Sequence, residues 1–382
     1  MISLPTWGLR SMPATFVTNI PTPYRVSMFN SLLKETERRG VNFFVLFMNR
    51  TEPNRNWAIE DELEFPYEQW DMPIATMKGV YFRFSLPFVL RAVKGNRHLI
   101  LGGSWNDLNI MAIALLKRMR LIKNKISFWT EANYLTVGAQ RSSRVKQFVR
   151  RFVLSSGDGY FFIPGEMSAI TLKKWGVTCG DRIVLLPNLP HLQFEDNIST
   201  WDGSNNSRPV FTIVARLDEE TKGIENFIEC LGVERIRKIR LNIIGSGHDF
   251  ARYEKYIKNR DLSDHVFLLG ELPGDDVIRH LKNSDVFVLP SFSDPSPLSL
   301  VEACKIGLPL LVSDRCGNHH ECLISGENGY LFDPSEAQQV ALAFDRILAN
   351  RSNWPNFSKG SVELAARNFD PQSVLRRLVA HL

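Results

Sequence analysis

Two carboxylates, Asp294 and Glu302, lie eight residues apart in the stretch 286–334, where an apolar run, a polar loop and a helical pattern follow one another. Residues 286–290 are rich in Val and predict a strand that is buried on both faces. Residues 298–306 repeat apolar side chains at helical spacing and end at a glycine, which predicts a helix. The two acids therefore bracket the turn from a strand into a helix.

This turn has the geometry of an anion site. At about 1.5 Å per residue, Glu302 would lie only about 6 Å along the axis from the helix start, so that Asp294 and Glu302 can reach one ligand. The backbone N–H groups of Leu298 and Ser299 would point at an anion, such as a phosphate between two sugar rings. The alternative is that Asp294 caps a turn and Glu302 is solvated.

The elements around this turn belong to an α/β fold. A second apolar run at 308–313 completes a strand, helix, strand unit, whose strands should be parallel and whose ligand face lies at their carboxyl ends. The same order recurs from residue 15 onward, and a polar stretch rich in Pro, Asn and Ser interrupts it. We expect two Rossmann-like domains that face each other across a cleft: a first domain at 1–190, a linker at 191–209, a second domain at 210–365, and a terminal helix at 366–382.

Charge is distributed unevenly along the 382 residues. Residues 1–190 carry 25 Lys and Arg against 14 Asp and Glu, whereas the remainder carries 21 against 27. A basic domain suggests an anionic partner. No nucleic-acid motif and no aromatic stacking platform accompany the basic runs, so we expect an anionic membrane surface and no nucleic acid.

Two basic stretches, 115–125 and 141–152, mix Lys and Arg with Leu, Val and Phe. This composition is typical of a basic amphipathic helix that lies on anionic lipid. An ordinary solvated helix face, packed inward by its apolar side, explains it equally well.

Membrane spans and metal-binding cysteines are not expected. The longest apolar run, residues 110–116, is much too short to cross a bilayer, and no signal sequence opens the chain. We therefore expect a cytoplasmic protein, peripheral at the inner membrane face. The five cysteines are odd in number and form no CxxC pair, which argues against a disulfide framework or a zinc site.

Several motifs in the second half occur together: VARLDEETKG, IIGSGHD, VFLLGEL, SDVFVLPSFSDPSPLSLVEACKIGLPLLVSD and GENGYLFDP. As a set they resemble the retaining nucleotide-sugar glycosyltransferases of family 4, within glycosyl transferases group 1, which have the GT-B fold. The resemblance covers most of residues 208–345 and, more weakly, the first strand and turn near Asn19. It implies a nucleotide-diphosphate sugar as donor, no metal and no other cofactor. It also implies that 1–190 is the acceptor-side domain, that 210–365 binds the nucleotide sugar, and that the helix at 366–382 packs back on the first domain.

The resemblance assigns roles to individual residues. Arg216 and Lys222 match the family's basic pair beside the donor diphosphate, where cations can neutralise the charge of the leaving group. Gly245 and Gly247 match the loop that lets backbone approach the diphosphate. Glu271 falls where the family contacts the base.

Asp294 and Glu302 match the ends of the family's paired-glutamate motif, in which the first acid contacts the transferred sugar and the second binds the ribose. Here the first acid is Asp, and Ser296 and Pro297 replace an aromatic-glycine pair. This DPxPL variant is similar to that of transferases that build bacterial surface polysaccharides.

The first domain departs further from the family. Its first loop is not glycine-rich, and its only early histidine, His98, lies at the wrong end of its strand to touch the sugar. Residues at strand carboxyl ends could contact the sugar or the acceptor instead, although each has a structural alternative: Asn19, Tyr24 and Arg25 in the first loop, Trp105, and Glu131.

The combined expectation is a GT-B glycosyltransferase with Arg216, Lys222 and Asp294 as catalytic residues. No side chain is well placed as a covalent nucleophile, so a same-face displacement is expected, in which the departing phosphate oxygen takes the proton of the acceptor. The acceptor would be a glycan or a lipid-linked sugar. Two alternatives remain open: a GT-B sugar-nucleotide epimerase, and a non-catalytic sugar-nucleotide-binding subunit.

Overall fold

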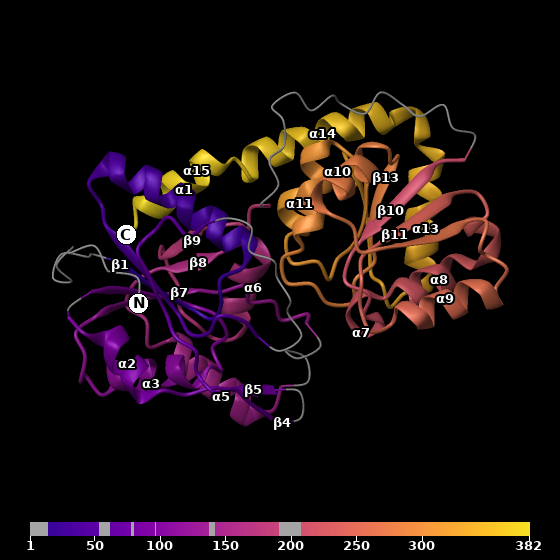
Figure 1. The fold of residues 1–382 in the computed structure, drawn as a ribbon. Coiled ribbons are helices and arrows are strands. Elements are labelled where there is room, and N and C mark those ends of the chain that lie inside the picture. The colour runs from indigo at the N-terminus through magenta and orange to yellow at the C-terminus, as the bar shows by residue number, and fades with distance from the viewer. Residues whose placement is uncertain (1–13, 53–61, 78–79, 96, 137–141, 191–207) are drawn as a thin grey trace.

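The computed structural model describes residues 14–52, 62–77, 80–95, 97–136, 142–190 and 208–382. They form two α/β domains, each built on a parallel sheet that is covered by helices on both faces (Figure 1). The expected pair of Rossmann-like domains is therefore confirmed. In both sheets the first strand lies in the interior, between the two halves of the strand order, and a crevice opens at the carboxyl end of such a strand.

The N-terminal sheet has seven strands. In spatial order they are β3 (Tyr67–Gln69), β2 (Phe43–Phe47), β1 (Ala14–Thr18), β6 (His98–Gly102), β7 (Lys125–Trp129), β8 (Phe161–Ile163) and β9 (Ile183–Leu185). A separate antiparallel pair consists of β4 (Ala75–Met77) and β5 (Val80–Phe82). The helices of this domain are α1 (Pro23–Arg39), α2 (Leu86–Val93), α3 (Leu108–Arg118), α5 (Arg144–Leu154) and α6 (Glu166–Lys174).

Side-chain alternation along β1 divides the N-terminal core into two layers. Phe16 faces α1, where it packs edge-on against Phe29 with ring centroids 5.1 Å apart. Val17 faces the opposite layer, which α2, α3 and α5 cover. Both side chains are fully buried, and burial of one such apolar side chain stabilises the fold by roughly 1.5–3 kcal/mol.

The C-terminal sheet has six strands. In spatial order they are β12 (Val266–Gly270), β11 (Arg240–Ile244), β10 (Val210–Val214), β13 (Val286–Leu289), β14 (Leu310–Ser313) and β15 (Gly329–Phe332). One layer of core contains α8 (Ile224–Ile236), α9 (Phe250–Asn259) and α13 (Ala337–Ala349). The other contains α10 (Gly274–Lys282), α11 (Leu298–Ile306), α12 (His319–Cys322) and α14 (Trp354–Asn368). Two short helices, α7 (Glu219–Lys222) and η1 (Arg351–Asn353), complete the domain.

The C-terminal end of the chain returns to the first domain. Helix α14 packs on α11, and α15 (Pro371–Val379) then packs against α1 and β9 (Figure 1). The Asp370 carboxylate accepts a hydrogen bond from the Ser373 N–H and caps α15. The structure thus places the terminal helix where the sequence analysis expected it.

Two expectations need adjustment. Residues 115–125 do not form one helix, because α3 ends at Arg118 and the chain turns away through Arg120 at a φ of 58°. The domain boundary at 365 falls inside α14, which runs to Asn368 because its apolar face continues on α11. Most of the expected linker, residues 191–207, lies outside the described residues.

Within the described chain, no helix has the length and apolarity needed to cross a bilayer.

Candidate functional site

The loop between β13 and α11 is held in place by the loop that follows β14. The Gly317 N–H donates a hydrogen bond of 2.8 Å to the Asp294 carbonyl, and Asn318 Nδ2 donates one of 2.9 Å to the Pro297 carbonyl. A Cβ on Gly317 would overlap the carbonyl oxygen of Pro295, so only glycine permits this approach. The backbone around Asp294 is therefore fixed without any ligand.

Lys222 and Asp294, two predicted catalytic residues, form an ion pair. The Lys222 Nζ contacts Asp294 Oδ2, and only 13% of each side chain is exposed. A backbone hydrogen bond of 3.0 Å from Ser293 N to Thr221 O fixes α7 beside the loop. The pair joins the carboxyl ends of β10 and β13, where a parallel sheet binds its ligands.

The third predicted catalytic residue, Arg216, lies nearby at the end of β10 but is open to solvent. Its side chain is 63% exposed and contacts Asp218 Oδ2 at 3.0 Å. Asp218, His248 and Asp249 form a group of possible metal ligands, with ligand atoms within 4.8 Å of one another. These carboxylates already have protein partners, since Arg216 pairs with Asp218 and the Glu219 N–H donates to Asp249 Oδ2 at 2.8 Å.

Gly245 and Gly247 are required by close contacts within the protein, and their predicted approach to a diphosphate stays a prediction. A Cβ on Gly245 would overlap the carbonyl oxygen of Ala215, and one on Gly247 would overlap that of Leu217. Both glycines let the loop after β11 approach the loop after β10. The close approach that the structure explains is thus between two segments of the protein.

The Glu302 carboxylate has neither a hydrogen bond nor an ion pair with any described residue, although the residue is half-buried in α11. Burial raises its pKa to about 7, and Lys305 opposes that shift. A half-buried carboxylate without a donor is costly, so a ligand hydroxyl would find a ready acceptor here.

The remaining predicted donor contacts lie around the same edge of the sheet. Leu298 and Ser299 open α11 as half-buried residues, and Pro297 before them gives no side-chain cap, so helix N–H groups remain available. Glu271 is exposed and accepts a hydrogen bond of 2.7 Å from Ser246 Oγ. The predicted donor residues therefore lie at the carboxyl ends of β10, β11, β12 and β13.

A pocket of about 420 Å³ faces this loop from the N-terminal domain. It opens at the carboxyl ends of β1, β6 and β7, and the C-terminal domain contributes Pro295 to its wall. Arg25, Trp105 and Glu131 line it, as the sequence analysis expected of an acceptor side. The Glu131 carboxylate accepts a hydrogen bond of 2.8 Å from Asn188 Nδ2.

Asn19 and Tyr24 do not line this pocket but contact Arg25. The expectation that Tyr24 and Arg25 lie in a loop is wrong, because α1 begins at Pro23, whose fixed φ suits the first helical position. Arg25 is therefore carried on the first turn of a helix.

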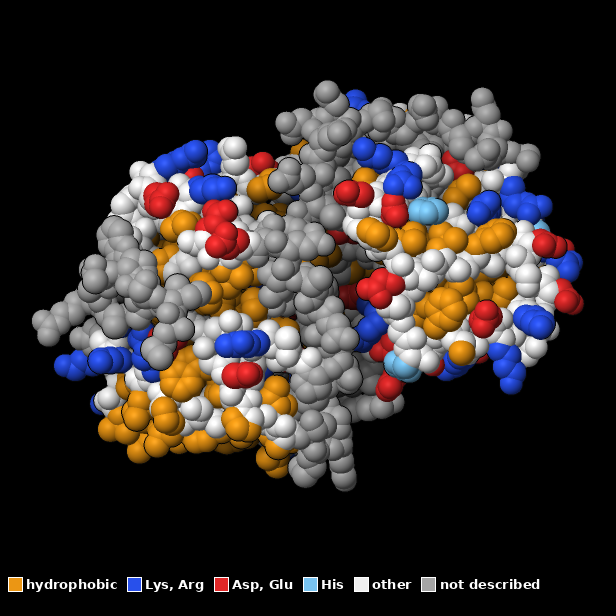
Figure 2. Space-filling view, viewed as in Figure 1, with side chains coloured by type: hydrophobic (Ala, Val, Ile, Leu, Met, Phe, Trp, Pro, Cys, Tyr) orange, Lys and Arg blue, Asp and Glu red, His pale blue; other side chains and the backbone are white. Residues whose placement is uncertain are grey.

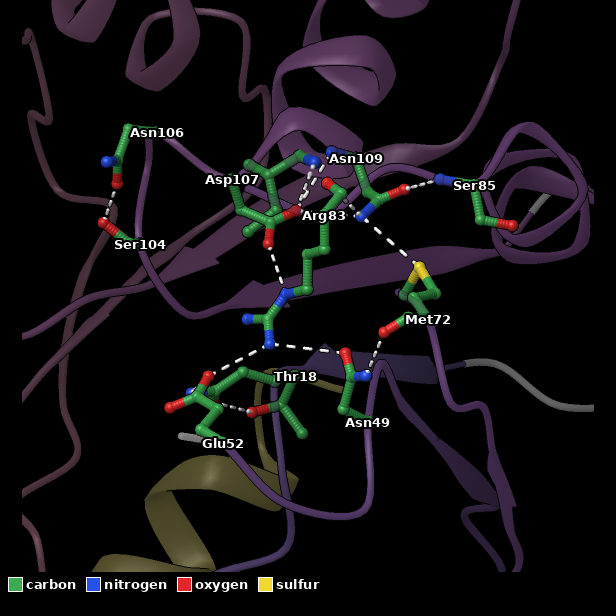
Figure 3. A network of polar contacts seen from close by, with 12 residues as sticks. Thr18, Asn49, Glu52, Met72, Arg83, Ser85, Ser104, Asn106, Asp107 and Asn109 are labelled. Atoms are coloured by element: carbon green, nitrogen blue, oxygen red, sulfur yellow. Dashed lines mark hydrogen bonds and ion pairs between the residues drawn. The ribbon is translucent and has the colours of Figure 1, made fainter. Parts of the chain in front are cut away.

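A polar network fixes this end of the domain (Figure 3). Arg83 donates hydrogen bonds from Nε to Asp107 Oδ2 at 2.8 Å and from Nη1 to Glu52 Oε1 at 3.0 Å. Glu52 accepts a hydrogen bond of 2.9 Å from Asn19, and Arg25 in turn donates one of 2.6 Å to Asn19. The network ties β1, α1 and α3 together and orients the Arg25 guanidinium.

Sequence reasoning did not find Arg83, Arg150 or Trp175 as parts of this region. Arg150 lay within a flagged basic stretch, but its composition did not show which face of α5 points into the pocket. His98, by contrast, is buried between Ser127 Oγ at 2.7 Å and the Leu382 carbonyl at 3.2 Å, away from the pocket.

The two domains touch at a few polar contacts. Asn133 Nδ2 donates to the Arg315 carbonyl at 3.4 Å, and the Glu166 N–H donates to Glu321 Oε1 at 2.7 Å. Burial raises the pKa of Glu321 to about 7 despite that hydrogen bond. These contacts hold the pocket of one domain against the loop between β13 and α11 of the other. This loop, residues 290–297, carries Asp294 and is called the carboxylate loop below.

Comparison with known proteins finds similarity that is concentrated in the second half of the chain. Residues 195–361 match the family model described as Glycosyl transferases group 1. The amylovoran biosynthesis glycosyltransferase AmsK of Erwinia amylovora is 32% identical over 142 residues, which cover 35% of this chain and 34% of that protein. The putative colanic acid biosynthesis glycosyltransferase WcaL of Salmonella typhimurium is 28% identical over 180 residues, 44% of this chain and 43% of that protein. The matches span a third to under half of these curated relatives.

Solved structures extend the likeness to both domains. HepE of Anabaena in complex with UDP has a TM-score of 0.71 and 14% identity, over 97% of this chain and 99% of that one. The lipopolysaccharide outer core galactosyltransferase WaaB has a TM-score of 0.69 and 17% identity, over 97% and 100% of the chains. These likenesses confirm the GT-B fold.

Proposed function

We propose that this protein transfers a sugar from a nucleotide-diphosphate sugar to a hydroxyl of a glycan or lipid-linked acceptor, with retention at the anomeric carbon, in bacterial surface-polysaccharide synthesis. The observation that carries the proposal is the Lys222–Asp294 ion pair beside the start of α11, within a domain that matches Glycosyl transferases group 1. UDP is the first nucleotide to test, because it is bound in the HepE structure.

The proposed reaction needs charge stabilisation more than covalent catalysis. The bond between the anomeric carbon and the diphosphate oxygen breaks, and the acceptor oxygen bonds to that carbon on the same face. The acceptor proton passes to the departing phosphate oxygen. Lys222, Arg216 and the N–H groups of Leu298 and Ser299 stabilise the growing negative charge, which makes a divalent metal unnecessary.

Glu302 and Asp294 divide the recognition of the donor in this proposal. Glu302 accepts hydrogen bonds from the ribose hydroxyls, and Asp294 contacts the transferred sugar. Glu302→Gln should therefore weaken binding of the nucleoside diphosphate by about 1.5–3 kcal/mol, since a charged hydrogen-bond acceptor is lost. Asp294→Asn should leave that affinity nearly intact and reduce transfer.

Calorimetry with UDP alone, beside turnover with the UDP-sugar, measures both effects. Equal loss of UDP affinity in the two variants would contradict the division of roles. An epimerase would instead return a changed sugar nucleotide, and a binding subunit would bind the donor without releasing UDP.

We further propose that the protein binds an anionic membrane at the cytoplasmic face. Support comes from exposed apolar side chains over α2, α3 and α5, which gather along the lower edge of the N-terminal domain in Figure 2. On α5, Val145 is 73% and Phe148 is 69% exposed. Nearby cations such as Arg118, which lies 4.6 Å from the Phe152 ring, complete the surface that an interfacial helix needs.

A further inference from the structure

The pocket of the N-terminal domain contains more positive than negative charge. Among its described lining residues, Arg25, Lys146 and Arg150 are cationic, whereas Glu131 is the one carboxylate. Three tryptophans, Trp105, Trp129 and Trp175, supply aromatic walls. Such walls suit the apolar faces of a sugar ring, and the charge suits an anion.

Arg150 is a buried cation without a counter-ion among the described residues. Only 5% of the residue is exposed, and its Nε is buried with no hydrogen-bond partner. The guanidinium lies 3.6 Å from the Trp175 ring and 5.9 Å from that of Trp105. An aromatic face compensates a buried guanidinium only in part, so the cost of burying this charge suggests an anionic ligand.

Arg25, on α1, is a second buried cation of this pocket without a counter-ion among the described residues. It is 9% exposed and donates at 2.6 Å to both Thr18 Oγ1 and Asn19 Oδ1, which are neutral acceptors. Its Nε is buried without a partner, and it lies 5.1 Å from the Trp129 ring. Within the described chain it forms no ion pair with a carboxylate. Two guanidinium groups from separate elements, α1 and α5, thus reach one pocket unneutralised.

We propose that this pocket binds an oxyanion carried by the acceptor, with Arg25 and Arg150 as its main contacts and Lys146 at the rim. The oxyanion is a phosphate of a lipid-linked sugar or a carboxylate of an acidic sugar. The inference rests on the proposed function, because it names the acceptor of the same site. Since Pro295 of the carboxylate loop lines the pocket, the acceptor hydroxyl next to the oxyanion would face the donor.

Two pairs of matched probes test this charge preference. Glucose 1-phosphate against methyl α-glucoside tests a phosphate, and glucuronate against glucose tests a carboxylate. Binding is measured by saturation-transfer NMR titration in excess UDP, which occupies the donor site. We expect the anionic member of at least one pair to bind about tenfold or more tightly than its neutral partner, and the pair that shows the preference identifies the oxyanion.

Substitutions identify the residues that cause the preference for the anionic probes. Arg150→Met and Arg25→Met keep the aliphatic volume and should each remove most of the preference, while binding of the neutral probes stays unchanged. Arg151→Met is the matched control, because Arg151 is exposed on the same helix and does not line the pocket. The two test variants lie on different helices, and a melting curve shows which of them fold.

Three results would overturn the inference: equal binding of the anionic and neutral probes, a preference that survives in both variants, or an anion that excess UDP displaces. The last result would assign the oxyanion to the donor. The test is separable from the proposed function, because a protein that turns over no sugar nucleotide would still show the charge preference if the pocket is built as described.

Discussion

Lys222 is the residue on which the proposed chemistry depends most. Replacing Lys222 or Arg216 with Ala should lower turnover by roughly two to three powers of ten, the cost of losing one preorganised charge or donor. Arg216→Ala should change folding little, because that side chain is 63% exposed, whereas Lys222→Ala leaves Asp294 without its partner and is accompanied by a melting curve. Lys255→Ala, on the exposed face of α9, is a control that should keep full activity. If either test variant turned over at nearly the wild-type rate, that cation would not be the one that stabilises the donor diphosphate.

Glu302 gives a pH dependence of known sign. Burial raises its folded pKa from the ordinary value of 4.5 to about 7. The group therefore lowers the stability of the fold as pH rises from about 4.5 to 7, and it causes no further change above pH 7. A ribose hydroxyl that donates to the carboxylate favours its charged form. UDP affinity should therefore increase as pH rises towards 7 and then level off.

Calorimetry between pH 5.5 and 8 checks this dependence, with Glu302→Gln as the reference. UDP titrates in the same range, so the contribution of Glu302 is the difference between the two profiles. Identical profiles for the wild type and the variant would show that Glu302 does not bind the ligand.

Sequence motifs pointed to Lys222, Asp294 and Glu302 because each belongs to a short segment with a local pattern. The structure pairs the first two, and their roles stay predictions. The N-terminal network offered no such pattern. Glu52, Arg83 and Asp107 are separated by long intervals, and the fold alone brings them together around Asn19.

At the scale of elements, regular periodicity predicted the strand, helix, strand unit that the structure shows as β13, α11 and β14. The range 298–306 expected for the helix after the carboxylate loop is the range of α11. The end of α3 was missed because apolar and basic residues continue past Arg118 into a turn. A pattern of residue types does not show where a helix stops when no glycine or proline marks the end.

Helix α5 carries the prediction for membrane binding. The protein should bind vesicles that contain anionic lipid, and raised salt should release it, because the lipid charges are then screened. Replacing Val145 and Phe148 together with Ser should weaken binding several-fold. Leu342→Ser, at a side chain that is 51% exposed on α13 of the other domain, is the control.

Vesicle flotation measures this binding directly. Equal binding to neutral and anionic vesicles, or none to either, would mean that α5 has an ordinary solvated surface.

At the scale of the whole molecule, the two domains present complementary surfaces. The C-terminal domain supplies the Lys222–Asp294 pair and the start of α11, and the N-terminal domain supplies a cationic aromatic pocket. Pro295 belongs to both surfaces, so donor and acceptor would meet beside the carboxylate loop. Domain order and fold class followed from the sequence, whereas this apposition required the three-dimensional arrangement.

Metal independence is a prediction that concerns the whole site. We expect full activity in excess EDTA, because Arg216 and Lys222 carry positive charge that a metal would otherwise supply. The Asp218, His248 and Asp249 group makes the experiment informative, since it is where a cation would bind if one were needed. Loss of activity on chelation, restored by magnesium or manganese, would contradict the expectation.

The most direct test of the central claim is release of nucleoside diphosphate from a panel of nucleotide sugars, followed by mass spectrometry. The wild-type protein should hydrolyse one or a few of them slowly without an acceptor, and Lys222→Ala should abolish that release. A wild-type protein that releases nucleoside diphosphate from no member of the panel, or that returns an epimerised sugar nucleotide, would contradict the assignment as a sugar transferase.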